Sequence, residues 1–259
     1  GNEAFYWCSL TNIDIPSSVT SIWWSAFDGC YKLTSVTFSE NSQLTSIGSS
    51  AFSDCEKLTS INIPSSVTSI WDSAFNGCSK LTSVTFGENS QLTSIRSSAF
   101  SGCSALTSIN IPSGVTSIKY HTFDGCSSLT NIEIPSSVTS IGEGAFFGCS
   151  KLTSIEIPSN VTWIGDSAFY GCSSLTSIEI PSSVTSIGGS VFSYCGKLKY
   201  NEYDNGLYLG NDRNPHFALI KAKTDDITSC TIHGQTKVIA DSAFCGYSSL
   251  TSIEIPSSV

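Results

Sequence analysis

The chain has 259 residues, of which 21 are acidic and 12 are basic, so its formal net charge is −9 and its pI is about 4.7. This acidity argues against a nucleic-acid partner, which requires clustered basic residues. No apolar run reaches the ~18 residues of a transmembrane helix. The opening residues GNEAFYWC resemble neither an initiator nor a signal peptide, so a partial or processed chain is expected.

A repeat dominates the sequence from its beginning. The Leu that precedes Thr-Ser or Thr-Asn recurs in steps of 23 or 25 residues, at Leu10, Leu33, Leu58, Leu81, Leu106, Leu129, Leu152 and Leu175. Such self-similarity indicates a solenoid, in which units too small to bury a core alone stack on one another. We expect a single solenoid over residues 1–259, with regular repeats at 1–197, a divergent unit at 198–226 and regular repeats again at 227–259.

Each unit predicts two short extended segments and one compact turn. In residues 152–172 the pattern Leu-x-x-Ile-x-Ile favours a strand whose Ile side chains point inward, and Pro158 ends it because proline gives no N–H to a ladder. Val-x-x-Ile predicts a second extended segment. The following Ser-Ala-Phe-x-Gly-Cys is too short for an ordinary helix and predicts one helical or 3₁₀ turn.

Phenylalanine and cysteine each occupy a fixed position of the repeat. The Phe row predicts a continuous core in which each ring contributes roughly 1.5–3 kcal/mol. The Cys row has no C-x-x-C pair and no nearby His pair, which argues against zinc and for buried free thiols, with Cys245 accessible. The rows are Phe5, Phe27, Phe52, Phe75, Phe100, Phe123, Phe146, Phe169, Phe192 and Phe244, and Cys8, Cys30, Cys55, Cys78, Cys103, Cys126, Cys149, Cys172 and Cys195.

The consensus L-x-x-I-x-I-P-x-x-V-x-x-I-G-x-x-A-F-x-G-C-x-x-L resembles the BspA-type leucine-rich repeats of bacterial surface proteins. The resemblance implies a right-handed leucine-rich-repeat solenoid, display outside the cell or at its surface, and adhesion or binding of host proteins. It supplies neither shared catalytic residues nor one ligand-binding motif. No phosphate loop, metalloprotease motif or nucleophile partner for the three His is present, so we expect no enzyme activity and no cofactor.

Positions that the repeat leaves free are candidates for binding. Where most units have Gly after the second extended segment, others have Trp, Arg or Lys, and the next position holds Trp or Tyr. Aromatic rings beside an Arg are typical of a binding hot spot. Alternatively, the Trp side chains cover the longer turns of the neighbouring 25-residue units. The candidates are Trp23, Trp24, Trp71, Arg96, Lys119 and Tyr120.

A second candidate is an acidic stripe on the concave face. Glu133, Glu156 and Glu179 lie between the two inward Ile of consecutive first segments, about 5 Å apart if the strands pair. The stripe is either a weak Ca²⁺ or basic-partner site or a solubilising face. Asn160, in Asn-Val-Thr, is a candidate glycosylation site.

The divergent unit predicts a β-hairpin. Asn205-Gly206 and Asn211-Asp212-Arg213-Asn214-Pro215 are turn signals on either side of short apolar runs. We expect Leu207–Leu209 to pair with Phe217–Ile220 and to project from the solenoid. The array regains its phase at Ile227.

Together these features predict a non-enzymatic, adhesin-like scaffold that binds a protein, with no membrane insertion in this segment. Two alternatives remain. The uncapped ends are compatible with head-to-tail stacking into filaments, and the exposed Trp and Tyr are compatible with a carbohydrate-binding module.

Overall fold

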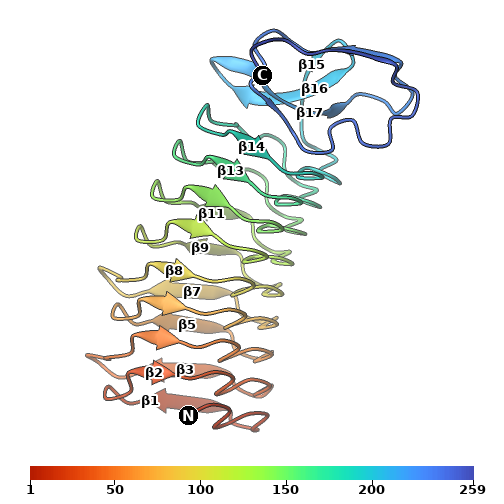
Figure 1. Cartoon of the computed structure of the whole chain (residues 1–259). Helices are drawn as coiled ribbons and strands as arrows, with labels where there is room; N and C mark the ends of the chain where they lie inside the picture. Colours follow the sequence, from red (N-terminus) through yellow and green to blue (C-terminus); the bar gives the residue numbers. More distant parts are fainter.

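The repeats fold into a stack of three-sided coils, each formed by a first strand, a second strand and a segment of turns (Figure 1). The computed structural model describes residues 1–259 and contains strands and turns only. None of its segments is a helix with the length and hydrophobicity that crossing a bilayer requires. The predicted solenoid is therefore confirmed.

The first strands pair in parallel from coil to coil. Alternate residues point inward, so Ile61 and Ile63 are buried while Ser60 and Asn62 are exposed. Two sheets result, one of β1 and β3 and the other of β5, β7, β9 and β11. These strands are β1 (Asn12–Ile15), β3 (Ser35–Phe38), β5 (Ser60–Ile63), β7 (Ser83–Phe86), β9 (Ser108–Asn110) and β11 (Asn131–Glu133).

The second strands are two residues long and pair over almost the whole array. Their sheets follow the orders β2-β4-β6-β8 and β10-β12-β13-β14, all parallel. The strands are β2 (Ser21–Ile22), β4 (Ser46–Ile47), β6 (Ser69–Ile70), β8 (Ser94–Ile95), β10 (Ser117–Ile118), β12 (Ser140–Ile141), β13 (Trp163–Ile164) and β14 (Ser186–Ile187).

The third side consists of successive tight turns, so the predicted helical or 3₁₀ turn is wrong. Ser50 and Asp54 have left-handed φ values of 52° and 53°, which a helical segment does not allow. The Phe52 N–H donates to the carbonyl of Ala74 in the next coil at 2.8 Å. Bonds between coils thus alternate with turn bonds within the coil, such as Ser53 N–H to the Ser50 carbonyl at 3.1 Å, and no continuous helical series forms.

The core is a pile of identical side chains. Nine Phe rings, from Phe5 to Phe192, stack face to face with centroids 5.1–5.8 Å apart and interplanar angles of 2–10°. The inner Ile, Leu, Val and Ala rows complete one cluster of 65 buried residues. Each coil therefore covers the apolar face of its neighbours, as the repeat predicts.

The cysteine row is buried from Cys30 to Cys195, and each of these thiols has a hydrogen-bond partner. The Cys55 S–H donates to the carbonyl of Phe27 at 3.3 Å, and the same bond recurs in every coil up to Cys195 and Phe169. All 11 Cys are free, and Cys245 alone is exposed. The prediction of free thiols with an accessible Cys245 agrees with this arrangement.

The divergent unit contains the antiparallel strands β15 (Asn201–Tyr203), β16 (Gly206–Asn211) and β17 (Asn214–Ala222). Tyr208 pairs with Leu219 and Leu209 with Ala218, as predicted. The prediction that the hairpin projects is wrong. Leu209 belongs to the main core, whereas Tyr208 and Leu219 are fully buried in a second cluster. The hairpin lies across the stack as an internal layer (Figure 1), because apolar side chains on both of its faces are buried.

The last coils pack on the other side of this hairpin. Their first strands, β18 (Ser229–Thr231) and β20 (Ser252–Glu254), pair in parallel, and β19 (Val238–Ile239) pairs with β17. The Asp241 N–H donates to the carbonyl of Ile187 at 2.8 Å, as Gly188 does to Ile164. The regular phase is thus regained beyond the hairpin.

Candidate binding surface

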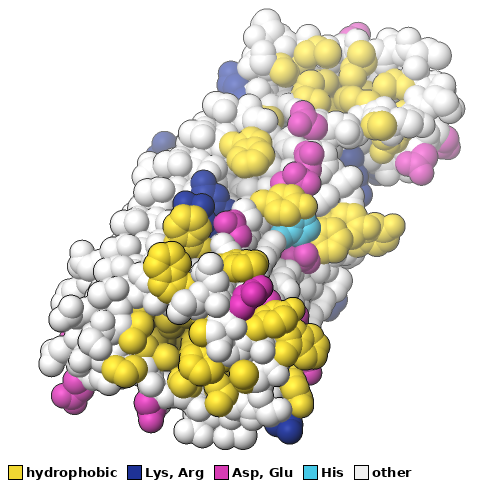
Figure 2. Space-filling model, turned by 60° about the horizontal axis from the view of Figure 1, so that its bottom comes forward, with side chains coloured by type: hydrophobic (Ala, Val, Ile, Leu, Met, Phe, Trp, Pro, Cys, Tyr) yellow, Lys and Arg dark blue, Asp and Glu magenta, His cyan; other side chains and the backbone are white.

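All five Trp side chains lie on the surface, although Trp is on average one of the more buried residue types. Their exposed fractions run from 36% for Trp71 to 62% for Trp7. The Phe row is the opposite, because its members from Phe27 to Phe192 are all buried. Figure 2 shows hydrophobic side chains gathered on one flank among acidic and basic ones. The chain thus places its Trp rings on the surface and most of the Phe row in the core.

The predicted Trp71 and Arg96 contact each other directly. The Arg96 guanidinium lies 3.7 Å from the centroid of the Trp71 ring and 4.0 Å from the Asp72 carboxylate. The Trp71 indole N–H donates to Ser69 Oγ at 3.2 Å. One indole face is therefore covered by a cation, and the ring orientation is fixed by a strand residue on the same side of the coil.

The predicted Tyr120 begins a longer series of rings. Its centroid is 4.1 Å from that of His121, which lies 6.2 Å from Phe147. Phe147 stacks on Tyr170 at 4.5 Å and 4°, and Tyr170 contacts Tyr194 at 4.9 Å and 52°. Phe147 and Tyr170 are half-buried, and the other members of the following set are exposed. We call the set Trp23, Trp24, Trp71, Arg96, Lys119, Tyr120, Phe147, Tyr170 and Tyr194 the aromatic edge.

The last three members of this edge were not predicted from the sequence. Phe147 and Tyr170 stand where other coils have Asp, Ser or Asn, within the turn segment. Tyr194 stands in the left-handed position that Gly171 and most other coils fill with glycine, and its φ is 60°. A bulky residue rarely adopts this conformation. The departure of Tyr194 from the Gly consensus is the sequence signal that could have identified it.

Trp7 shares that left-handed position, with a φ of 54°. A Cβ atom on Gly29 would lie 2.7 Å from the Trp7 indole nitrogen, so this indole rests against the glycine of the next coil. Tyr194 is 74% exposed. Burial therefore offsets little of the strain at Tyr194, a pattern that is associated with functional positions.

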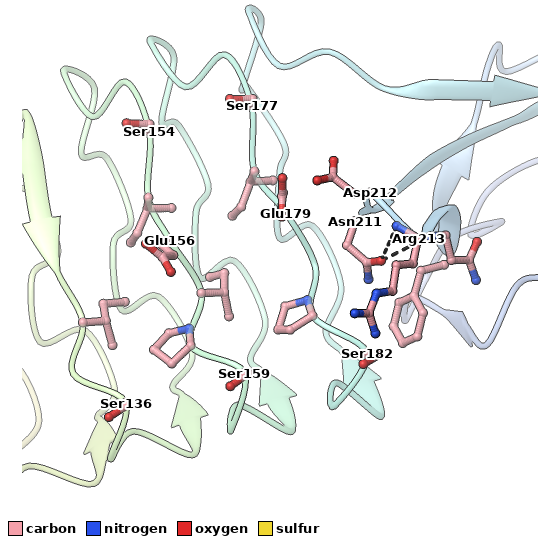
Figure 3. Close-up of a pocket in the computed structure, with 18 of the residues that line it drawn as sticks. Ser136, Ser154, Glu156, Ser159, Ser177, Glu179, Ser182, Asn211, Asp212 and Arg213 are labelled. Carbon is pink, nitrogen blue, oxygen red and sulfur yellow. Dashed lines mark hydrogen bonds between the residues drawn. The ribbon is translucent and has the colours of Figure 1, made fainter.

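The acidic stripe lies in a hollow of about 1,210 Å³ beside the hairpin. Glu133, Glu156 and Glu179 line it from consecutive coils, and the hairpin turn adds Asp212 and Arg213. Figure 3 shows the Glu side chains on one wall and the hairpin turn on the other. The turn is held by Asn211 Oδ1, which accepts from the N–H groups of residues 213 and 214 at 3.1 and 3.2 Å.

The first segments of the three coils that carry this stripe do not pair with one another. β11 is the last member of its sheet, and the segments around Glu156 and Glu179 form no ladder with it. Glu133 therefore lies on a strand that pairs with β9, whereas Glu156 and Glu179 lie on segments without the predicted pairing. No group of three His, Cys, Asp or Glu side chains has the arrangement of a metal site. Asn160 is exposed, and its amide donates to the Ser136 carbonyl at 2.7 Å.

Comparison with known proteins identifies the family to which the repeats belong. Residues 1–130, 93–212 and 222–259 match the BspA type leucine rich repeat region, with six copies. A leucine-rich repeat protein from Bacteroides ovatus has a TM-score of 0.64 and 26% identity, over 100% of this chain and 76% of that chain. The T. pallidum leucine rich repeat protein has a TM-score of 0.59 and 30% identity, over 73% and 84%.

The pneumococcal vaccine antigen PcpA shares the fold, with a TM-score of 0.60 and 23% identity over 96% of this chain and 63% of that chain. A comparison with curated proteins gives no match.

Proposed function

Because the chain belongs to the BspA-type leucine-rich repeat family, we propose that it is an adhesin-like scaffold that binds a partner protein through the aromatic edge. Leucine-rich repeats form a scaffold that is generally used for protein binding. Membership in a family that includes bacterial surface proteins supports display outside the cell. The observation on which the proposal rests is that every Trp is exposed while the Phe row is buried from Phe27 to Phe192.

The chemistry of the edge supports a protein partner. Trp, Tyr and Arg are the residue types in which binding energy concentrates at protein interfaces. The Trp71–Arg96 pair is already arranged, so it loses little conformational freedom on binding. Lys119 and Asp72 add one charge of each sign, and complementary charges supply orientation more than affinity.

The ring geometry disfavours a glycan. Sugars stack on the open face of an aromatic ring, whereas one Trp71 face is covered by Arg96. Phe147 and Tyr170 occupy each other's faces at an interplanar angle of 4° and present mainly their edges. Ring edges and phenolic hydroxyls suit the aromatic, amide and carbonyl groups of a protein.

The proposal is tested with the Trp23→Ala/Trp71→Ala double variant against a panel of immobilised matrix proteins and a glycan array. We expect a matrix protein bound by the wild type to lose about 30-fold or more in affinity, the effect of removing one hot spot. Tyr31→Ala is the matched control, because Tyr31 is also exposed but contacts Ser9, outside the edge. Loss confined to glycans would instead support the carbohydrate-binding alternative.

Tyr194→Gly gives a sharper test. Restoring the glycine of the consensus relieves the left-handed strain and is expected to stabilise the fold by roughly 1 kcal/mol. The same change removes the end of the aromatic edge, so affinity should fall while the melting temperature rises. If affinity is unchanged, Tyr194 is no part of the binding surface.

A further inference from the structure

Two of the three histidines form a stacked pair at the hairpin. The rings of His216 and His233 lie 4.2 Å apart with an interplanar angle of 21°. Tyr203 meets the His233 ring edge-on at 4.7 Å, and Tyr208 meets the His216 ring edge-on at 5.3 Å. Aromatic groups on both sides thus hold the two imidazoles face to face.

The pair spans the boundary between the hairpin and the final coils. His216 belongs to β17, while His233 follows β18. The backbone on either side is joined across the same boundary. Thr236 Oγ1 donates to the His216 carbonyl at 3.1 Å, and the Lys237 N–H donates to the Phe217 carbonyl at 2.9 Å. Any force that separates the two rings therefore acts on the contact of residues 227–259 with β17.

The geometry favours neutral rings. The Gln235 N–H donates to His233 Nδ1 at 3.2 Å, so this nitrogen is an acceptor and carries no proton. The backbone N–H of His233 donates to the hydroxyl of the buried Tyr208 at 3.3 Å. Burial and then the neighbouring His216 lower the pKa of His233. Protonation would remove an acceptor and place a positive charge against a second imidazole.

A shared metal ion does not fit this arrangement. An imidazole binds a metal in the plane of its ring, and two nearly parallel, stacked planes have no common point for one ion. The face-to-face geometry instead makes the pair sensitive to protonation.

We propose that the His216–His233 stack is an acid-sensitive latch that holds residues 227–259 on the hairpin at neutral pH and releases them when the rings are protonated. A His whose pKa is lowered in the folded state stabilises it above the ordinary value of about 6.5, and this stability is lost as the pH falls. Two imidazolium ions at this separation also repel each other.

The other ionisable groups around the pair do not neutralise such a charge by direct contact. Tyr203 on β15 and Tyr208 on β16 are neutral in this pH range. The Asp204 carboxylate accepts from the Thr231 N–H at 2.6 Å. The Glu254 side chain contacts Thr231 Oγ1 at 3.5 Å. Neither carboxylate is hydrogen-bonded to an imidazole.

The test is hydrogen exchange of the whole chain at pH 7.5 and 5.0, corrected for the intrinsic pH dependence and referred to the amides of β5, β6 and β7. We expect amides of β19 to exchange about tenfold faster at pH 5.0, while the reference strands stay unchanged. In the His216→Gln/His233→Gln variant this acceleration should disappear. His121→Gln, which removes the remaining His, should behave like the wild type.

Histidine resonances give a second measurement if the double variant does not fold. His233 should titrate below its ordinary range in the wild type and move back toward it in His216→Gln. Equal protection of β19 at both pH values would overturn the proposal. An acceleration that survives the double variant would also overturn it, and its loss in Asp204→Asn would then assign the effect to that carboxylate.

Discussion

Two stretches of the first-strand side both have apolar inward residues but differ in their outward ones. Around Asn62 and Thr85 the strands pair in full register, and Thr85 Oγ1 donates to Asn62 Oδ1 at 3.0 Å. Around Glu156 and Glu179 the ladder is absent, while the second strands of the same coils remain paired. The loss of the ladder is therefore confined to the side on which the carboxylates lie.

A single Glu does not prevent pairing. Glu133 pairs with Asn110, and Glu254 pairs with Thr231. Beyond β11 the ladder is absent where Glu follows Glu. Like charges on adjacent strands destabilise their pairing, so we propose repulsion between these carboxylates as the cause of this gap. A separate gap between β3 and β5 contains no charged pair, and nothing in the structure explains it. The core row of Phe rings continues unbroken through both gaps, so the absence of the ladder does not interrupt the core.

The largest expected effect is alkaline unfolding, which should affect both stretches alike because both contain buried thiols. Burial raises the pKa of Cys78 and Cys149, and it raises the pKa of Cys195 to about 11. These groups stay protonated in the folded state while the unfolded chain ionises above about pH 8.5. Stability is therefore present below that pH and is lost as the pH rises, by up to about 1.4 kcal/mol per pH unit for each buried thiol.

Urea unfolding between pH 8 and 10 measures this slope. Cys78→Ala and Cys149→Ala should each reduce it by about one proton. A stability that stays flat to pH 10 would contradict the buried, protonated thiols.

The next largest effect concerns the Phe stack. Phe75→Ala lies in the paired stretch and Phe146→Ala near the open one, and both rings are fully buried. Each should lose roughly 3–5 kcal/mol through lost burial and the cavity that remains. Equal losses in chemical denaturation would show that the core couples the coils independently of the ladder. A much smaller loss for Phe146→Ala would show that the open ladder already weakens its coils.

The repeat made most of the fold predictable. Every inward residue recurs with the period of the coil, so the strands, the Phe row and the thiol row follow from one aligned unit. The turn segment was misjudged because Ser in the left-handed conformation has no distinctive sequence signal; Ser50 and Ser73 look like helix-compatible residues. The hairpin pairing was predicted from its turns. Its burial was not, because only the three-dimensional stack shows that Tyr208 and Leu219 face the last coils.

The candidate surface was predictable only in part. Trp23, Trp71 and Tyr120 interrupt a Gly or polar position, and such interruptions are visible in one sequence. Phe147 and Tyr170 become a continuous series with Tyr120 only because the turn segments of adjacent coils lie side by side. The loss of the ladder at Glu156 was not predictable, because the inward Ile155 and Ile157 follow the same consensus as those of the paired strands.

The smallest effect tests the difference between the two stretches directly. Glu156→Gln removes the middle charge of the stripe, so we expect a gain of about 0.2–1 kcal/mol and new protection of the amides at residues 154–157 in hydrogen exchange. The wild type should approach this state in 0.5 M salt, because salt screens exposed charges. Asn110→Glu places a carboxylate next to Glu133 and should open the paired β9–β11 ladder. In Thr85→Glu the new carboxylate has only Asn62 and Asn110 at the same position of the adjacent coils, so the strands should stay paired. This control distinguishes an effect of charge repulsion from an effect of the poor strand propensity of Glu. If Glu156→Gln leaves the amides of residues 154–157 unprotected, the geometry of the coils prevents pairing, and repulsion between the carboxylates is not the cause.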